Sequence, residues 1–533
     1  MVPSKVNYSM KSSEHKNLLS IMGASLGALI LGSCGSGPHY YNLKGDVDNA
    51  NGSLSYEIFV RSFYDSNGDG VGDFKGVAEK AQYLQDLGVS NVWLMPIYPT
   101  SSYHGYDVTD FYGVNSEFGT MDDFTDMVAE LKKHGIRVTL DMVLNHSGSR
   151  HPWFAQSYRD YLAGNKEESS KADWYNWSES DSTGYAKFGE AYYEARFSSS
   201  MPDFNWDSLA FRKEVKNILN FWMEKGIYGF RLDAVLYYYY NQHEKNAEVC
   251  TFLKEACPEA YFVGEAWCTG SSYYRYFDSK LDSFFDFDTS ISANNDFITT
   301  AKGFTSGDSL SKKLEEEITA AKSRNPDAYP SFFLSNHDQD RSSKSLNGNS
   351  AKLAASLLYL TPGTPYIYYG EEIGLEGTRG KENSDAMRRL PMIWSKSDKK
   401  GETKCPDPSV ATLYANLNQV EEGADDLYKD PTSLLSHYRK LGEVRNSIPW
   451  IQNASLEAIS TNSDYICAFT LISQDKSKKM LVVTNTAREG NIDFDVPSSA
   501  KLFDSINTIG VSPSLNGGKL TLASSSTAIL TID

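Results

Sequence analysis

The sequence is poor in cysteine, histidine and positive charge. It contains 6 cysteines and 9 histidines in 533 residues, and their spacings match no zinc-ligand pattern. Apart from Cys34, five cysteines remain, an odd number that defines no disulfide framework, so buried free thiols are expected. The net charge of −18 argues against nucleic acid as a partner, because a phosphate backbone is bound by positive surfaces. Such a charge is compatible with a neutral ligand.

Long hydrophobic runs are also scarce, and the one that occurs lies near the N-terminus. Residues 18–31 follow several lysines and are too short and too rich in Gly and Ala for a stable transmembrane helix. The run ends in Leu-Gly-Ser-Cys34, which resembles a bacterial lipoprotein signal that is cleaved before an acylated cysteine. The alternative is a plain export signal with an incidental cysteine.

The N-terminal region is therefore predicted to be a signal and a linker, and not part of the fold. Residues 1–34 form the predicted signal peptide, and the polar residues 35–52 form a flexible tether. A lipid anchor at Cys34 would be the only membrane attachment, since no later stretch could cross a membrane. Export would permit a disulfide, for which Cys250 with Cys257 or Cys268 is conceivable.

The rest of the chain contains short apolar strands that end in polar residues. Residues 229–233 form one such strand, and its Arg231 and Asp233 lie two positions apart, so both side chains point to the same face. A neighbouring cation favours an ionised carboxylate, which suits a nucleophile in sugar chemistry. Three further strands end in the same way: 137–146, 261–267 and 331–338. Four such strands predict an active site at the C-terminal end of a parallel α/β barrel.

These four stretches resemble the signature regions of a known enzyme family. They read DMVLNH, GFRLDAV, VGEAW and FLSNHD, and they occur in the usual order of the α-amylase superfamily of glycoside hydrolases. The resemblance extends from about Ser55 to about Trp394. It implies an α/β fold: a (β/α)8 TIM barrel with a domain B insertion after strand 3 and a C-terminal antiparallel β-sandwich.

The sequence pattern agrees with that division into domains. The barrel, domain A, is predicted over 53–146 and 203–444, and domain B over 147–202, where the alternation of helices and strands breaks down. Residues 445–533 contain short alternating strands and form the predicted sandwich, domain C. Within the barrel, residues 74–87 and 122–134 are predicted to be helices, and Asp203 is expected to tie domain B to the barrel.

The resemblance assigns the catalytic roles residue by residue. Asp233 would be the nucleophile, Glu265 the general acid and later the base, and Asp338 the third carboxylate, which grips the hydroxyl groups of the sugar. A covalent intermediate served by two carboxyls predicts that they lie about 5–5.5 Å apart and that the α-configuration is retained. Glu265 needs a raised pKa to arrive protonated near neutral pH.

The same resemblance implies six residues around the cleaved sugar: His104, Tyr106, Asp107, His146, Arg231 and His337. Tyr106 would stack under the sugar ring, while His104 and Asp107 would shape its binding site. His146 and His337 would hydrogen-bond the sugar, and Arg231 would keep Asp233 ionised. Outside the family resemblance, a lone histidine or tyrosine in a loop is more often structural.

The loop at residues 65–73 has the pattern of a calcium site. Oxygen-bearing side chains occur at every second position, and Gly70 permits a sharp turn, as in the first part of an EF-hand loop. The predicted ligands of a structural Ca2+ are the side chains of four residues and one carbonyl: Asp65, Asn67, Asp69, Asp73 and the carbonyl of Val71. The twelfth position is Gly76 and not glutamate, so a solvated acidic turn is the alternative.

Three details of the sequence bear on the substrate. Ala234 directly follows the nucleophile, where a small residue accompanies α-1,4 cleavage in related oligosaccharide enzymes. Leu236 and Tyr237 replace a Lys-His pair of many α-amylases, which puts their reducing-side contact and a calcium site involving Asn145 in doubt. The stretch MPDFN at 201–205 resembles a family motif of subgroups intermediate between oligo-1,6-glucosidases and neopullulanases. The stretch RLPMIW at 389–394 is similar to one found in members of the family that act on oligosaccharides.

The predicted protein is an exported lipoprotein at the outer membrane, on the cell surface, that performs retaining endo-hydrolysis of α-1,4-glucosidic bonds. Its partners would be starch and maltooligosaccharides, with pullulan as a further candidate substrate, and other glycan-uptake proteins of the outer membrane. One alternative is an α-glucosidase or transglycosidase acting on short α-glucans. A more distant alternative is a non-catalytic glycan-binding lipoprotein, which the three intact carboxylates oppose.

Overall fold

The structure is a computed structural model that describes residues 54–291, 294–381, 384–415, 417, 419–461, 463–508 and 510–532. The predicted signal peptide and tether, with the predicted lipid-anchor residue Cys34, lie outside the described residues.

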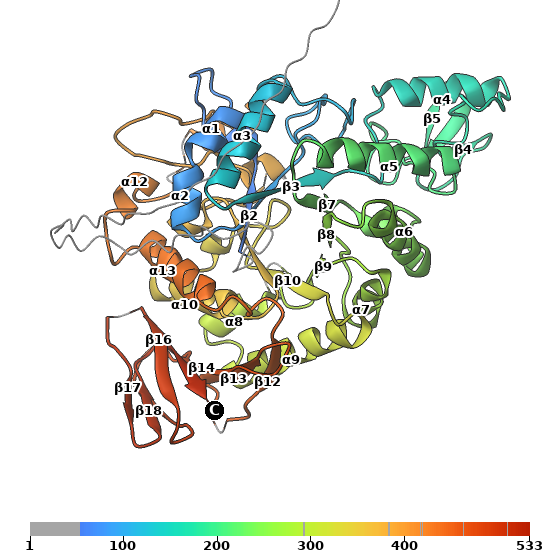
Figure 1. Ribbon diagram of the computed structural model, residues 1–533. Coiled ribbons are helices and arrows are strands. Elements are labelled where there is room, and N and C mark those ends of the chain that lie inside the picture. Colours follow the sequence, from blue (N-terminus) through green and yellow to red (C-terminus); the bar gives the residue numbers. More distant parts are fainter. Residues whose placement is uncertain are drawn as a thin grey trace, which may run out of the picture. The chain divides into compact units, whose positions relative to one another are not determined.

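Eight parallel strands close into a barrel, which confirms the predicted fold class (Figure 1). In order around the barrel they are β1 (Ser55–Ile58), β2 (Asn91–Leu94), β3 (Arg137–Met142), β7 (Gly229–Leu232), β8 (Tyr261–Gly264), β9 (Ser283–Phe285), β10 (Tyr329–Phe333) and β11 (Thr364–Tyr368). The ring closes where β11 pairs with β1, with Tyr366 opposite Ser55. Because all strands run in one direction, their C-terminal ends meet at one mouth of the barrel.

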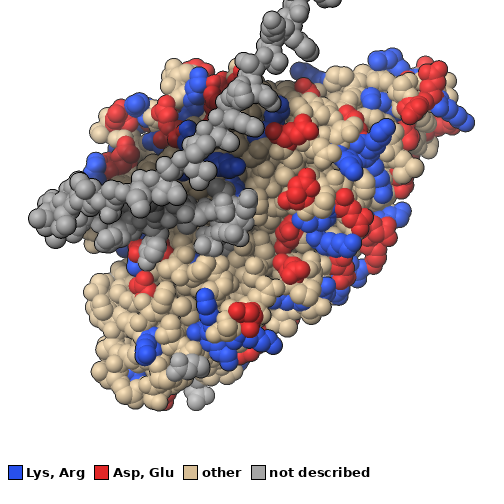
Figure 2. Space-filling view, viewed as in Figure 1, with Lys and Arg blue, Asp and Glu red and all other residues tan. Residues whose placement is uncertain are grey.

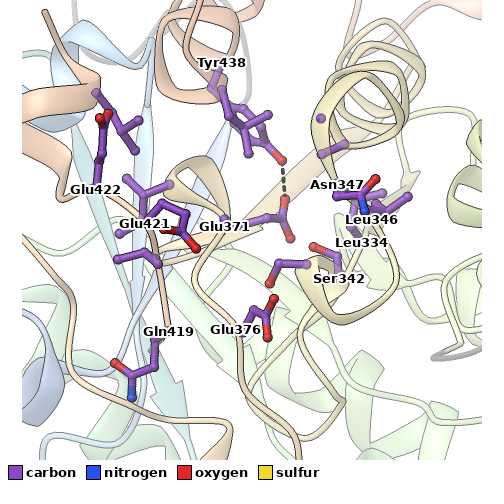
Figure 3. A pocket seen from close by; sticks show the side chains of 18 residues that line it. Leu334, Ser342, Leu346, Asn347, Glu371, Glu376, Gln419, Glu421, Glu422 and Tyr438 are labelled. Carbon is purple, nitrogen blue, oxygen red and sulfur yellow. Dashed lines mark hydrogen bonds between the residues drawn. The ribbon is translucent and has the colours of Figure 1, made fainter. Parts of the chain in front are cut away.

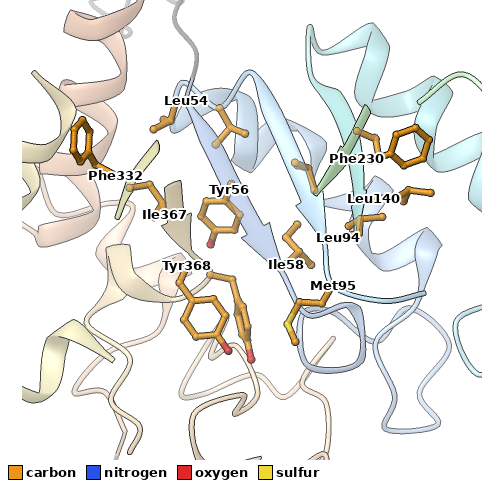
Figure 4. Packing of buried hydrophobic residues seen from close by; sticks show 14 of the residues in the cluster. Leu54, Tyr56, Ile58, Leu94, Met95, Leu140, Phe230, Phe332, Ile367 and Tyr368 are labelled. Carbon is orange, nitrogen blue, oxygen red and sulfur yellow. The ribbon is translucent and has the colours of Figure 1, made fainter. Parts of the chain in front are cut away.

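Both faces of these strands are buried, which explains their nearly continuous apolar sequences. Alternate residues such as Tyr56, Ile58 and Leu94 join the large core between the strands and the surrounding helices (Figure 4). The residues between them face the barrel interior, where Trp93 and Phe285 belong to a separate aromatic cluster. Period-two alternation therefore decides which side chains enter the barrel.

Helices surround the barrel: α1 (Phe74–Glu79), α2 (Ala81–Asp86), α3 (Met121–Lys133), α5 (Leu209–Met223), α6 (His243–Ala256), α7 (Gly270–Tyr274), α8 (Asp296–Ala301), α9 (Gly307–Arg324), α10 (Gly348–Tyr359), α11 (Ala411–Tyr414), α12 (Ala424–Leu427) and α13 (Leu434–Asn446). The single helix predicted over 74–87 is wrong, because it divides at Lys80. The Lys80 amide bonds the carbonyl of Val77 three residues back, and its φ/ψ of −97°/8° leaves α-helical geometry.

The insertion between β3 and α5 has a small fold of its own. It contains α4 (Pro152–Leu162) and a three-stranded antiparallel sheet in the order β4 (Trp177–Ser178), β6 (Ala191–Glu194), β5 (Tyr185–Phe188). Phe154 of α4 stacks on Trp177 with ring centroids 5.3 Å apart, so the aromatic residues of this segment form a local core. Asn145 after β3 donates to the Asp203 carboxylate (3.0 Å), as expected for a residue that ties the insertion to the barrel.

The C-terminal region is a pair of antiparallel sheets, as predicted. One has the order β12 (Ser455–Ala458), β13 (Ile466–Ile472), β14 (Lys479–Asn485), β19 (Ser526–Ile532), β16 (Lys501–Asn507), and the other the order β15 (Ile492–Asp495), β18 (Lys519–Leu522), β17 (Ser514–Asn516). Strands β18 and β19 are separated by a turn in which Ser525 takes a left-handed φ of 51°. Helix α9 packs against β12 and β13.

Three further properties concern the cysteines, the apolar character of the helices and the surface charge. Among the described residues, the cysteines Cys250, Cys257, Cys268, Cys405 and Cys467 are free thiols, in line with the odd count. No helix in the described ranges has the length and apolar composition needed to span a membrane. Acidic and basic side chains are interspersed over the face seen in Figure 2.

Candidate active site

The polar residues predicted at the strand ends meet in one cleft at the C-terminal mouth of the barrel. Asp233 follows β7, Glu265 follows β8 and Asp338 follows β10, and all three line a cavity of about 680 Å³. Its wall also includes Tyr103, His104, Tyr106, His146, Phe197, Met201, Ala234, Leu236, Tyr237, Trp267, Arg379, Asp385 and Arg389. Residues distant in sequence thus form one site because parallel strands end together.

A single buried guanidinium connects the carboxylates. Nη1 of Arg231 donates to Asp233 Oδ1 (2.7 Å) and to both oxygens of Asp141 (3.0 Å each). Its Nη2 lies 3.1 Å from Glu265 Oε2. The predicted pairing of Arg231 with Asp233 on one strand face is present, and it extends to Glu265. Since a guanidinium stays protonated in proteins, it provides a permanent positive charge beneath both carboxylates.

The residue after Asp233 has an unusual backbone. Ala234 takes left-handed φ/ψ angles of 49°/42°, which cost a non-glycine residue roughly 1–2 kcal/mol. In this conformation its N–H donates to Glu265 Oε2 (2.8 Å), and the next amide, Val235, donates to the Glu265 carbonyl (3.0 Å). The strained turn therefore joins the end of β7 to the end of β8 and fixes the Glu265 carboxyl. Strain of this kind is common at functional sites.

The environments of two carboxyls push their pKa values in opposite directions. Burial raises the pKa of Glu265 to about 7, and Asp233 and Asp338 add to the rise while Arg231 opposes it. Burial acts in the same direction on Asp338, but His337 and Arg389 outweigh it and hold the pKa of Asp338 well below its usual value. One carboxyl is thus protonated near neutral pH beside another that is ionised, which is the requirement for an acid and its charged partner.

Asp338 is held from its sides and left open toward the cleft. Arg389 Nη2 donates to Asp338 Oδ1 (2.9 Å), and His337 Nε2 lies 3.0 Å from Oδ2. The Asp338 side chain is nevertheless 32% exposed, whereas the side chains of Asp233 and Glu265 are 11% and 8% exposed. This carboxylate can therefore accept hydrogen bonds from a ligand while both cations hold it.

The predicted sugar-binding residues Tyr106, His104 and His146 also line the cleft. The Tyr106 hydroxyl lies 2.6 Å from His337 Nε2 and donates to Asp141 Oδ2 (3.1 Å), and the Tyr106 and His337 rings stack at 15°. His104 Nδ1 accepts from the Tyr106 amide (3.1 Å). His146 lies in the cleft wall, and burial lowers the pKa of its imidazole.

Asp107 has a different position from its neighbours. Its carboxylate accepts from Thr100 Oγ1 (2.5 Å), from the Ser101 amide (3.2 Å) and from the Ser102 hydroxyl, and it is not part of the cleft wall. It therefore orders the loop that carries His104 and Tyr106. A direct contact of Asp107 with substrate stays a prediction.

Several site residues were not identified from the sequence. Arg389 pairs with Asp338, Asp141 pairs with Arg231, and Glu57 of β1 lies 2.5 Å from His337 Nδ1. A glutamate inside a fully buried strand is itself a signal, because Glu is almost never buried without a partner. Exposed aromatic rings were also missed: Phe197 (48% exposed) contacts Tyr237, with ring centroids 4.4 Å apart.

The loop predicted to bind calcium has suitable donors, but they are turned toward the loop itself. Asp65 accepts from the amides of Gly68 and Gly70 (2.6 Å each), and Asp73 caps α1 through the Gly76 amide (2.7 Å). Gly70 takes the left-handed φ of 97° that the turn requires. In the described ranges, no three His, Cys, Asp or Glu residues converge as metal ligands, so the calcium site stays a prediction.

A second cavity of about 320 Å³ shares no lining residue with the cleft. At its centre lies the buried Glu371, whose carboxyl accepts a hydrogen bond from the Tyr438 hydroxyl (3.0 Å; Figure 3). Burial raises the pKa of Glu371 to about 8. We call this space the Glu371 cavity.

Known proteins resemble this chain over most of its length. Residues 57–454 match the family model described as alpha amylase, catalytic domain. Alpha-amylase 3 of Dictyoglomus thermophilum is 38% identical, with 83% of this chain and 86% of that protein covered. Oligo-1,6-glucosidase of Parageobacillus thermoglucosidasius is 28% identical, with 81% and 89% covered. The solved structure of Eubacterium rectale Amy13B superposes with a TM-score of 0.83 at 33% identity, covering 91% and 96%. The chain therefore belongs to the alpha-amylase family of glycoside hydrolases.

Proposed function

We propose that this glycoside hydrolase is a retaining endo-hydrolase of α-1,4-glucosidic bonds in starch and maltooligosaccharides, with pullulan as a further candidate substrate. The observation that carries the proposal is one cleft that brings together Asp233, Glu265 and Asp338, with Arg231 in contact with both Asp233 and Glu265. The raised pKa of Glu265 and the lowered pKa of Asp338 support it. Membership of the family supports action on α-glucans. The bond type and the endo mode are inferred from the cleft.

The proposed reaction has two steps. In the first, an oxygen of Asp233 attacks the anomeric carbon while Glu265 donates its proton to the departing glycosidic oxygen, which leaves a glycosyl ester on Asp233. In the second, Glu265 takes a proton from water, the water oxygen attacks the anomeric carbon, and the ester bond to Asp233 breaks. Two inversions at this carbon give net retention, and Glu265 is protonated again at the end.

The surrounding residues serve the charge that develops during these steps. Asp338 accepts hydrogen bonds from sugar hydroxyls and stabilises the positively charged, oxocarbenium-like transition state. Arg231 positions Asp233 and Glu265 on one guanidinium. Tyr106 presents its ring beside the same site, where a sugar can stack. Each group is held by the protein before substrate arrives, so little reorganisation is needed.

The aromatic lining supports binding of a chain longer than one sugar. Trp267, 38% exposed, stacks on Phe287 after β9 at 4.5 Å and 13°. Phe197 and Tyr237 extend the lining on the side of the insertion and β7. Flat apolar rings placed beyond the carboxylates offer stacking surfaces to further sugar units. An exo-acting glucosidase needs a cleft for the chain end only.

Ala234 supports α-1,4 specificity. It lies in the cleft wall directly beside Asp233, and its methyl group is the smallest side chain that retains a Cβ. A bulkier residue here would narrow the space beside the nucleophile. The sequence similarity to an oligo-1,6-glucosidase keeps an α-glucosidase or transglycosidase as the second candidate.

The test is a time-course of products from amylose and from pullulan, separated by chromatography, with Asp233→Asn as a blank. Mixed maltooligosaccharides in the first minutes would support endo-hydrolysis, and panose from pullulan would extend it to that polymer. Glucose alone from the start would identify an α-glucosidase, and products longer than the substrate a transglycosidase. No product from the unaltered protein would favour a glycan-binding protein without activity.

We also propose that the loop at residues 65–73 binds a structural Ca2+. Carboxylate, amide and carbonyl oxygens are the ligands that Ca2+ prefers, and those of Asp65, Asn67, Asp69, Val71 and Asp73 lie on one tight loop. The ion would stabilise the loop between β1 and α1 and take no part in the reaction. Chelation should lower the melting temperature, and added Ca2+ should restore it; Asp69→Asn should reduce both effects. An unchanged melting temperature would identify a solvated acidic turn.

We propose, finally, that the protein is a lipoprotein of the outer membrane, exposed at the cell surface, where it acts with other glycan-uptake proteins. The support is the Leu-Gly-Ser-Cys34 stretch after an apolar run. Cys34→Ala should move the protein from the detergent phase to the aqueous phase in a detergent-partition experiment. Detergent partition that survives this substitution would contradict a lipid anchor at Cys34.

A further inference from the structure

Glu57 lies inside the barrel and directly behind the catalytic cleft. Its neighbours Tyr56 and Ile58 pack toward the surrounding helices, so the period of the strand turns Glu57 to the interior. It sits opposite Trp93 of β2 and Tyr368 of β11, and it is 1% exposed. A charged residue is costly in such a place unless it has an oppositely charged partner.

That partner is His337, which lies between two carboxylates. Glu57 Oε1 is 2.5 Å from His337 Nδ1, and Asp338 Oδ2 is 3.0 Å from His337 Nε2. A carboxylate can only accept hydrogen bonds, and a neutral imidazole carries one proton. When both of these carboxyls are ionised, each ring nitrogen that faces one needs a proton, and His337 is then an imidazolium cation.

The contacts of His337 continue to the catalytic residues. With a proton on Nε2, His337 faces the Tyr106 oxygen at 2.6 Å, so the Tyr106 hydroxyl is left to donate to Asp141 Oδ2 at 3.1 Å. Asp141 in turn accepts from Arg231, which contacts Asp233 and Glu265. A chain of hydrogen bonds thus runs from β1 to the nucleophile and the acid.

We propose that Glu57 is a positioning residue for catalysis: it holds His337 as a cation, and His337 in turn holds Asp338 ionised and fixes the direction of the Tyr106 hydroxyl. Glu57 acts through His337 and touches no reacting atom. The proposal rests on the proposed function in so far as Asp338 and Tyr106 bind the cleaved sugar.

The balance of charges around His337 supports this assignment. The titratable and charged groups that face it or its partners are Glu57, Tyr106, Asp141, Arg231, Asp338, Tyr368 and Arg389. A cationic His337 pairs with Glu57, Arg389 pairs with Asp338, and Arg231 pairs with Asp141, Asp233 and Glu265. A neutral His337 would leave Glu57 as a buried charge without a cation, a costly state.

The electrostatics of the site agree with the geometry. Burial alone would lower the pKa of His337, but the Asp338 and Glu57 carboxylates outweigh burial and raise it to about 10. The cation would therefore persist across the pH range in which an ordinary histidine loses its charge.

The direct test is the protonation state of His337 at pH 8, where an ordinary imidazole is neutral. The chain is labelled with 15N-histidine, its ring nitrogens are observed by long-range 1H–15N NMR, and His337 is assigned from the spectrum of His337→Gln. We expect both His337 nitrogens to show protonated-type shifts in the unaltered enzyme. In Glu57→Gln, which keeps the size and an accepting oxygen but removes the charge, one nitrogen should lose its proton at pH 8.

Activity gives a second readout with a matched control. Loss of a supporting carboxylate of this kind reduces activity by roughly 10–100-fold, so we expect kcat/KM of Glu57→Gln on maltoheptaose to fall by about that factor, mainly through kcat. The control is Glu372→Gln, another buried glutamate, which accepts from the Tyr56 and Tyr83 hydroxyls (2.7 and 2.6 Å) and has no contact with His337. Its activity should change less than about twofold.

Either of two results would overturn the proposed role of Glu57. A His337 that is neutral at pH 8 in the unaltered enzyme would overturn it, even if Glu57→Gln failed to fold. A folded Glu57→Gln that keeps both ring protons and full activity would overturn it as well. The NMR measurement needs no substrate, so it remains decisive if maltoheptaose proves not to be cleaved, which would count against the proposed function alone.

Discussion

The cleft and the Glu371 cavity both contain buried glutamates with raised pKa values, yet only the cleft is equipped for catalysis. Burial raises the pKa of Glu265 to about 7 and that of Glu371 to about 8. Judged by the raised pKa of a buried glutamate alone, the two cavities are equivalent. They differ in what contacts the carboxyl groups.

Around Glu371 and the adjacent Glu372, the side chains that donate hydrogen bonds to the carboxyl groups are neutral hydroxyls, and Arg341 acts on both carboxyls only through its charge. Tyr438 and Ser335 donate to Glu371, while Tyr56 and Tyr83 donate to the adjacent Glu372. These hydrogen bonds require no charge on the donors, as expected of a structural site.

In the cleft, by contrast, cations contact the carboxyl groups. Arg231 touches Asp141, Asp233 and Glu265, whereas Arg389 and His337 hold Asp338. His337 and Arg389 lower the pKa of Asp338, while burial raises that of Glu265. A proton donor and an anion can therefore coexist within one site. A raised carboxyl pKa therefore indicates only that the group is buried. A raised and a lowered carboxyl pKa within one cleft indicate a site equipped for catalysis.

The largest loss of activity should come from removal of the proposed nucleophile in the cleft. In Asp233→Asn, the amide cannot form the glycosyl ester, so kcat/KM on maltoheptaose should fall by about 10⁴-fold or more. The amide still fills the same space, so the melting temperature should change little. Steady-state kinetics and thermal unfolding check both points. Activity comparable to that of the unaltered enzyme would contradict the assignment of Asp233.

Replacement of the acid should have the next largest effect. Glu265→Gln should reduce kcat/KM by roughly 10²–10⁴-fold on maltoheptaose, because general acid catalysis contributes about that factor. The loss should be smaller on 4-nitrophenyl α-maltoside, whose leaving group needs less protonation. If the two substrates lost activity equally, Glu265 would not be the proton donor.

The pH dependence of the same enzyme tests the pKa of this acid. Glu265 must be protonated to donate, so kcat/KM of the unaltered enzyme should decline as the pH rises through about 7. This alkaline limb should be absent in Glu265→Gln with the activated substrate. An unaltered enzyme with constant activity up to pH 9 would contradict the assignment.

Relief of the strain beside the nucleophile should give a modest effect on stability. Glycine tolerates the left-handed angles of residue 234, so Ala234→Gly should stabilise the fold by up to about 1 kcal/mol in urea unfolding. Ala234→Val, with a β-branched side chain at the same angles, should destabilise it. A destabilised glycine variant would show that the Ala234 methyl group contributes more than the strain costs.

The smallest effect on activity should come from the Glu371 cavity. Glu371→Gln should change kcat/KM by less than about twofold, but it should alter the pH dependence of stability. The folded carboxyl keeps its proton up to about pH 8, whereas the unfolded one releases it near 4.3, so folding becomes less favourable as the pH rises between these values. Urea unfolding at pH 5 and pH 8 should show this decline in the unaltered enzyme and a smaller one in the variant. A tenfold loss of activity in Glu371→Gln would show that the Glu371 cavity also contributes to catalysis.

The barrel, and the meeting of the proposed catalytic carboxylates at its mouth, could be predicted from the sequence because their signals are local. Apolar strands of three to six residues mark the barrel, and the polar residues that follow them, such as Asp233 and Glu265, must meet where parallel strands end. The two-residue spacing of Arg231 and Asp233 likewise determines that they share a face.

Other features of the site could not be predicted from the sequence, chiefly because they depend on contacts between distant segments. Glu57 and His337 are 280 positions apart, and only the closure of the barrel brings them together. Arg389 was noted as part of a motif, but its contact with Asp338 comes from the path of the loop after β11. The left-handed angles of Ala234 have no sequence signal, since alanine rarely adopts them.

The central claim is that Asp233 forms a covalent intermediate and Glu265 serves as acid and then base, and the anomeric form of the first product tests it most directly. The anomeric protons are followed by 1H NMR in the first minutes of maltoheptaose hydrolysis, before mutarotation mixes the two forms. The account predicts that the new reducing ends appear as the α-anomer and only later equilibrate. A β-anomer that appears first would show direct attack by water with inversion and would contradict the nucleophilic role of Asp233.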